Sequence, residues 1–155
     1  MDPITLARAA HVLAIVFWIG GVAFVTLVLL PALRDEPPHM RVATFERLER
    51  RFGRQAKIAV LIAGGTGFYM THVLDGWGRF LEPSFWWMHA MLFVWSAFTL
   101  VLFVLEPLVL HDWFHRHAAR DPEKTFGLIE RLHRVLLSAS LVTVAAAVLG
   151  AHGML

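Results

Sequence analysis

The fold is decided by residues 4–33, which read ITLARAAHVLAIVFWIGGVAFVTLVLLPAL. Only Arg8 and His11 interrupt this apolar run. A helix needs roughly 20 apolar residues to cross about 30 Å of hydrocarbon, so the run is long enough to span a membrane. We expect the segment to be retained, because it is longer than the apolar core of a signal peptide and no small-residue cleavage pattern follows it.

Three further apolar runs follow, at residues 58–74, 84–110 and 135–149. A proline with an acidic residue or a second proline before it stands ahead of each of the four runs: Asp2-Pro3, Pro37-Pro38, Glu82-Pro83 and Asp121-Pro122. Proline suits the first helical turn, where its missing N–H is not needed, and an acidic neighbour favours the positive end of the helix dipole. The sequence therefore predicts four helices, near residues 3–34, 39–74, 83–118 and 122–151.

This pattern predicts an all-α membrane protein, a four-transmembrane-helix bundle in which residues 1–155 form a single transmembrane domain. Hydrophobic residues make up 57% of the chain and charged residues 17%, against about 25% charged in soluble domains. Cysteine is absent, which excludes disulfides, thiolate metal sites, iron–sulfur clusters and c-type haem. The formal net charge of only +2 gives no reason to expect a nucleic-acid partner.

The basic residues indicate the orientation. Residues 34–57 contain seven Lys and Arg and residues 111–134 contain five, whereas only Arg8 and Arg79 lie on the other side. The positive-inside rule places the two basic loops in the cytoplasm and both termini on the non-cytoplasmic side. We expect a bacterial inner (cytoplasmic) membrane protein, in contact with lipid. Segment 39–57, with Phe45, Leu48 and Phe52 on one face, fits an amphipathic extension beyond the bilayer.

Three histidines are expected at a similar depth in the outer half of the bundle. His11 lies eight residues after Pro3, roughly 12 Å along its helix, and His89 lies roughly 9 Å after Pro83. His72 is near the end of the second predicted helix. An ionisable residue inside a span is costly, so each is a site candidate, although a single histidine can also simply hydrogen-bond between helices.

Methionines share that depth. Met70, Met88 and Met91 lie in the outer half, and thioether with imidazole is a ligand set that Cu(I) prefers. Imidazoles from facing helices also hold b-type haem in bundles. Trp18, seven residues after His11, is on the same helical face and is a candidate to line such a pocket.

Each of these features also has a structural interpretation. Methionine fills gaps in bundles. The glycines of Gly20-Gly21 and Gly64-Gly65-Thr66-Gly67 either let helices approach closely or open space for a macrocycle. Trp77, Trp86 and Trp87 are expected in an interfacial aromatic belt. The His111 and His115 pair has i, i+4 metal-ligand spacing at a charged helix end.

Several of these strings resemble known membrane families. His11 through Trp18-Ile19-Gly20-Gly21 to Leu30-Pro31 resembles the first helix of the CopD-type (copper resistance protein D) membrane domain, and of HemJ-type protoporphyrinogen oxidases. Residues 51–54 leading to Thr66-Gly67 resemble the second CopD-type helix. Residues 87–91, WMHAM, are similar to the tryptophan–leucine–histidine–x–lysine stretch of HemJ-type proteins.

The resemblance implies a four-helix bundle that handles haem or copper at its outer side. In HemJ-type proteins the first-helix histidine and the third-helix lysine are associated with haem binding and activity. His11 matches the former, but Met91 stands where the lysine would be. A thioether is neither a cation nor a proton donor, which argues against protoporphyrinogen oxidation. If the chain is an enzyme, we expect an oxidoreductase.

Three functional hypotheses follow. The leading one is a b-type haem protein with bis-histidine ligation, His11 with either His72 or His89, for one-electron transport to quinone or a membrane or periplasmic redox partner. The second is copper binding or uptake through a cluster of Met and His side chains: Met70, His72, Met88, His89 and Met91 with His11. The third is a non-catalytic accessory subunit of a larger membrane complex, and oligomers are compatible with all three.

Overall fold

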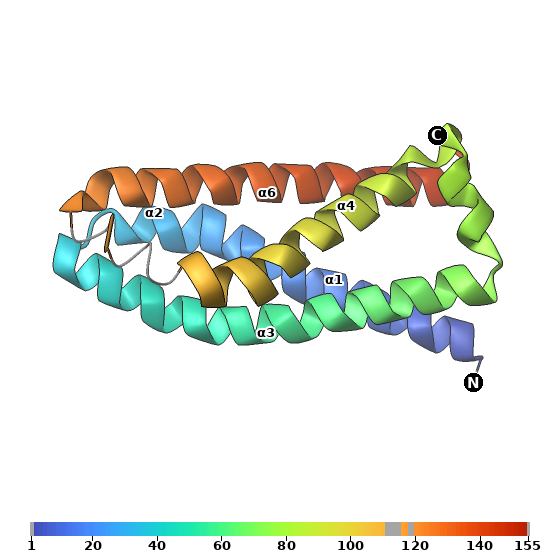
Figure 1. Ribbon diagram of the computed structural model, residues 1–155, viewed down its shortest axis with the longest axis horizontal. Helices are drawn as coiled ribbons and strands as arrows, with labels where there is room; N and C mark the ends of the chain where they lie inside the picture. The colour runs from blue at the N-terminus through green and yellow to red at the C-terminus, as the bar shows by residue number, and fades with distance from the viewer. Residues whose placement is uncertain (1, 111–115, 118–119, 155) are drawn as a thin grey trace.

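A computed structural model describes residues 2–110, 116–117 and 120–154, and all regular structure among them is helical. The predicted all-helical architecture is therefore confirmed. Figure 1 shows the elements in chain order. They are α1 (Pro3–Phe24), η1 (Val25–Leu29), α2 (Leu30–Leu33), α3 (Pro38–Val73), η2 (Gly76–Leu81), η3 (Pro83–Phe85), α4 (Trp86–Leu100), η4 (Val101–Leu110) and α6 (Pro122–Ala151).

The first helix runs through α1, η1 and α2 without a break. It begins where the Asp2 carboxylate accepts hydrogen bonds from the backbone N–H groups of Ile4 and Thr5. The π-helical segment η1 lies just before Pro31. Proline removes a backbone donor and clashes with the carbonyl four residues earlier, and a wider turn relieves both problems.

The same effect appears in the third long helix. Segment η4 is π-helical, and Pro107 lies inside it. The neighbouring Glu106 carboxylate is 3.0 Å from the Lys57 ammonium of α3, so a charge on one helix is neutralised by a charge on another. The predicted end of this helix at residue 118, and the His111 and His115 pair, lie outside the described residues.

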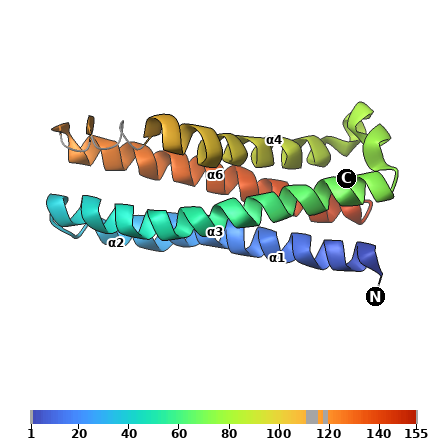
Figure 2. The same ribbon diagram turned by 60° about the horizontal axis from the view of Figure 1, so that its bottom comes forward.

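The four long helices run alongside one another as two pairs, α1 with α3 and α4 with α6 (Figure 2). Both chain termini and η2 lie at one end of the bundle, which we call the terminal end (Figure 1). The opposite end, which we call the basic end, holds the α2–α3 connection and the start of α6. His11, near the start of α1, belongs to the terminal half of the bundle.

Within the described residues, three helices are long and apolar enough to cross a membrane: Pro3–Leu33, Pro83–Leu108 and Glu123–Ala151. Helix α3 is not among them, because its first half is charged and its apolar half also contains glycine, threonine, tyrosine and histidine. Large apolar side chains cover the outward faces, with Leu13 58%, Leu27 65% and Phe93 72% exposed. Such faces match a lipid environment and are unusual on a soluble monomer.

Aromatic side chains cross between helices to fill the space above glycines. A methyl group added at Gly64 would lie 2.6 Å from the Trp95 ring, and one at Gly150 would lie 2.4 Å from the Trp87 ring. Trp87 is therefore buried, at 7% exposure, and is not part of the aromatic belt in which it was predicted. Trp77 and Trp86 are exposed.

Replacing Gly64 with alanine is expected to lower the free energy of unfolding by about 1–3 kcal/mol, the usual cost of overpacking. The Trp95 ring cannot move freely, because its indole N–H donates a 2.9 Å hydrogen bond to the Val60 carbonyl. Gly65→Ala is the matched control, since open space surrounds that position and alanine favours a helix by about 1 kcal/mol. Thermal unfolding in detergent would compare them, and equal stability of the two variants would contradict this account.

Candidate functional site

The imidazole of His11 is held against α3. Its Nδ1 lies 2.9 Å from the Ala63 carbonyl oxygen and 3.0 Å from the Thr66 hydroxyl. The Thr66 hydroxyl itself lies 2.6 Å from the Ile62 carbonyl, to which it donates. The arrangement is satisfied when Nδ1 carries the proton and donates it to Ala63. The ring is then the tautomer with a free lone pair on Nε2.

Gly67 completes the contact between α1 and α3. A Cβ at this position would lie 3.3 Å from the His11 Cε1 atom, so only glycine leaves the ring its full space. Ala63, Thr66 and Gly67 thus form the face of α3 that meets His11. Met70 lies three residues after Gly67 and four after Thr66, which places it on the same face one turn further along.

His72 lies on a different face of α3. It follows Ala63 by nine residues, about two and a half turns, so its side chain leaves the helix opposite the face that meets His11. The side chain is exposed. The sequence pattern placed His11 and His72 at one depth, but depth alone does not fix helix rotation, and the helix phase separates them.

His89 is occupied by backbone carbonyls. Its Nε2 lies 2.9 Å from the Phe80 oxygen and its Nδ1 lies 3.2 Å from the Phe85 oxygen. A neutral imidazole can donate to one of these oxygens and a protonated ring to both. The ring also packs edge-on against Phe80, with centroids 5.7 Å apart. In this arrangement His89 ties the start of α4 to η2.

The other predicted site residues lie in two places. Met88 and Met91 are half-buried on α4. Trp18 is 2% exposed in the core and meets Phe98 edge-to-face at 4.9 Å. Its indole N–H is buried and has no hydrogen-bond partner in the described part of the chain, which is rare for a buried donor.

These positions meet the requirements of a haem in part. The Nδ1 of His11 is held by the Ala63 carbonyl, but His72 lies on the opposite face of α3 and both ring nitrogens of His89 already contact carbonyls. Over residues 2–110, 116–117 and 120–154, no three His, Cys, Asp or Glu side chains are grouped to hold a metal ion. A haem with two axial ligands, or a copper site that includes methionine, needs no such group.

A second cluster at the basic end was not predicted as a site. Arg41 is 5% exposed, and its guanidinium lies 5.6 Å from the centroid of the Phe126 ring. It donates hydrogen bonds to the backbone carbonyls of Arg34 and Glu36. It also donates to the Glu123 carboxylate. Glu130 is 4% exposed, and both Arg34 and Arg134 donate to it. The i, i+4 spacing of Glu130 and Arg134 was visible in the sequence, but Arg34 is 96 residues distant.

Comparison with known proteins shows a similarity to a bacterial protein. Over 115 residues the chain is 31% identical to a protein of Aquifex aeolicus (strain VF5) described as "Uncharacterized protein". The matched region covers 74% of this chain and 71% of the relative. No family model and no solved structure matches the chain. At this identity and coverage, the chain belongs to the same family as the Aquifex aeolicus protein.

Proposed function

We propose that the chain is a b-type haem protein of the bacterial inner membrane that carries single electrons, with His11 as one axial ligand. It has four spans, α3 included, with both termini on the non-cytoplasmic side, because its basic residues gather at the other end. The haem supplies reversible one-electron chemistry at iron. Two axial ligands favour electron transfer over oxygen chemistry. The partner is quinone or a membrane or periplasmic redox protein.

The observation that supports this proposal is the restraint on His11. A ligating histidine usually donates its second ring N–H to a carbonyl or carboxylate, which fixes the tautomer and the ring orientation. The Ala63 carbonyl is 2.9 Å from Nδ1 and meets that requirement. The indole N–H of Trp18, which has no partner among the described residues, adds support, since a buried donor without a partner is costly unless a bound group satisfies it. We also propose that the chain is related to CopD-type membrane domains.

Three side chains compete for the second axial position. His72 requires a rotation of α3, and His89 requires release of the Phe80 or Phe85 carbonyl. Met70 shares the face of α3 that meets His11, and a thioether opposite an imidazole is a known haem ligation. Single alanine variants at the three positions decide between them, because only removal of the true ligand abolishes the six-coordinate α band.

The test is a dithionite-reduced minus oxidised absorption spectrum of the detergent-purified protein, expressed with haem supplied. We expect a Soret band and a sharp α band at the position typical of b-type haem. A flat difference spectrum from folded protein would overturn the haem proposal.

Copper is the second candidate, and the position of Met70 favours it. Cu(I) prefers thioether and imidazole ligands, and Met70 with His11 presents one of each across the α1–α3 contact. Met88 and Met91 on α4 are further soft donors. Titration with Cu(I) under reducing conditions separates the candidates. Met91→Ala should weaken copper binding and leave the α band of a haem ligated by His11 unchanged.

A further inference from the structure

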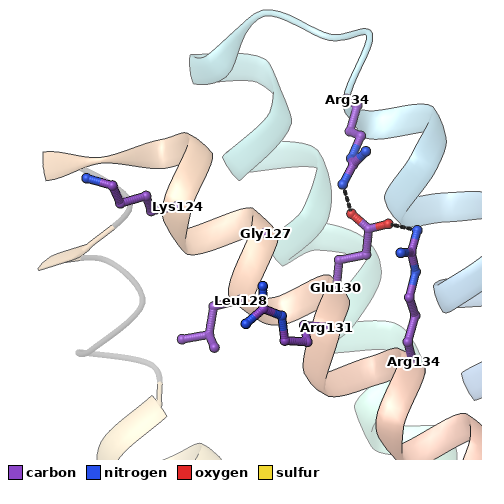
Figure 3. Close-up of a pocket in the computed structure, with 7 residues that line it drawn as sticks. All are labelled: Arg34, Lys124, Gly127, Leu128, Glu130, Arg131 and Arg134. Atoms are coloured by element: carbon purple, nitrogen blue, oxygen red, sulfur yellow. Dashed lines mark hydrogen bonds and ion pairs between the residues drawn. The ribbon is translucent and has the colours of Figure 1, made fainter.

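The basic end of the bundle contains a pocket of about 450 Å³ between the end of α2 and the first turns of α6. Figure 3 shows the residues that line it. They are Arg34, Lys124, Gly127, Leu128, Glu130, Arg131 and Arg134. Four of the seven are cationic and one is a carboxylate, so the lining carries an excess of positive charge.

Some of the cationic side chains in this pocket contact a carboxylate, whereas Arg131 contacts none among the described residues. Figure 3 shows Glu130 between Arg34 and Arg134, which both donate to its carboxylate. Lys124 lies 2.8 Å from the Asp121 carboxylate. Arg131 has no acidic partner in the described part of the chain, and its side chain turns away from Glu130 (Figure 3). A guanidinium without an acidic partner, in a pocket with excess positive charge, attracts an anion.

The position of the pocket relative to the membrane indicates which kind of anion binds there. Arg34 directly follows the apolar run of the first helix, which ends at Leu33, and Arg134 directly precedes the apolar run of α6 at residues 135–149. The pocket therefore lies where a span emerges from the hydrocarbon, at the level of the lipid phosphates. Leu128, 40% exposed, adds an apolar surface to the lining.

We propose that this pocket binds a phosphate group, and that its source is the headgroup of an anionic phospholipid. Arg131 supplies the main contact, with Lys124 as a second donor. Arg34 and Arg134 are held in place by Glu130 and add positive charge around the site. The proposal is independent of haem or copper, because His11 lies in the terminal half of the bundle.

The test uses the full chain in nanodiscs of phosphatidylcholine with a minor fraction of phosphatidylglycerol. Native mass spectrometry then counts the lipids that stay bound. We expect the wild type to retain phosphatidylglycerol in preference to phosphatidylcholine, and Arg131→Gln to weaken that retention roughly tenfold, the value of one charged hydrogen-bonded contact. Arg131 makes no ion pair in the described structure, so this variant should fold normally. Lys124→Gln should show a smaller loss.

Arg54→Gln is the matched control, since Arg54 is an exposed arginine of α3 that does not line the pocket. Equal retention of the two lipids would overturn the proposal, and so would equal losses of retention in Arg131→Gln and Arg54→Gln. The basic residues would then serve only to orient the chain in the membrane. Calorimetric titration with inorganic phosphate, in phosphatidylcholine nanodiscs, tests whether the pocket binds free phosphate in place of a lipid headgroup. Strong binding of free phosphate that requires Arg131, without retention of phosphatidylglycerol, would overturn the lipid assignment.

Discussion

Replacing His11 with alanine is expected to abolish the α band of the reduced-minus-oxidised spectrum. Alanine removes the only imidazole of α1, and the haem would lose the axial ligand whose orientation is already set by the Ala63 carbonyl. The loss should be complete, because a haem with one ligand removed does not keep its six-coordinate spectrum. The measurement is the difference spectrum at equal protein concentration, with the haem content determined separately.

His152→Ala is the matched control for this variant. His152 is exposed at the end of α6, and its Nδ1 lies 2.8 Å from a carbonyl of its own helix, that of Val148. Its removal should leave the spectrum unchanged. An α band that persists in folded His11→Ala protein would contradict the proposed role of His11. If His11→Ala keeps a normal α band and only the midpoint potential of the haem changes, His11 lies near the haem without ligating it.

Thr66→Val separates the two contacts of His11. Valine has nearly the shape of threonine but lacks the hydroxyl that lies 3.0 Å from Nδ1. The Ala63 carbonyl would still accept the ring N–H, so we expect haem to be retained with a changed midpoint potential. Loss of haem in this variant would show that the hydroxyl, and not the carbonyl, fixes the ring.

The helices were predictable because their signals are local. Asp2 and Asp121 precede prolines, and each carboxylate accepts backbone hydrogen bonds from the first turn of its helix. The π-helical segments just before Pro31 and around Pro107 are also local consequences of proline. The composition of α3 was a weaker signal, and this helix falls short of the apolar character of the other three.

The candidate site was predictable only in part, because it depends on helix rotation and on backbone geometry outside the helices. The sequence placed His11 correctly in the terminal half of the bundle, but not the carbonyl that orients it. His89 meets the Phe80 carbonyl only because η2 folds back beside α4. The Arg34–Glu130 contact joins residues 96 apart, and no local pattern predicts such a pair.

That long-range contact carries the largest expected effect on stability. Replacing both Arg34 and Arg134 with alanine should lower the free energy of unfolding by about 3 kcal/mol. Removing the partners of a buried charge costs about 3–5 kcal/mol, and the lower end applies because both arginines are partly exposed. Their side chains are 59% and 62% exposed, whereas that of Glu130 is only 5% exposed. The measurement is unfolding in a single detergent, followed by tryptophan fluorescence.

Glu130→Gln on the double-variant background distinguishes an unpaired charge from lost packing. Glutamine keeps the shape of glutamate and removes the charge that alanine at Arg34 and Arg134 would leave buried, so it should restore most of the stability. If the loss came only from the missing arginine side chains, glutamine would restore nothing. Arg50→Ala with Arg54→Ala removes the same charge from exposed positions of α3 and should have little effect. A similar loss in that control would mean that net charge, and not the buried carboxylate, determines stability at the basic end.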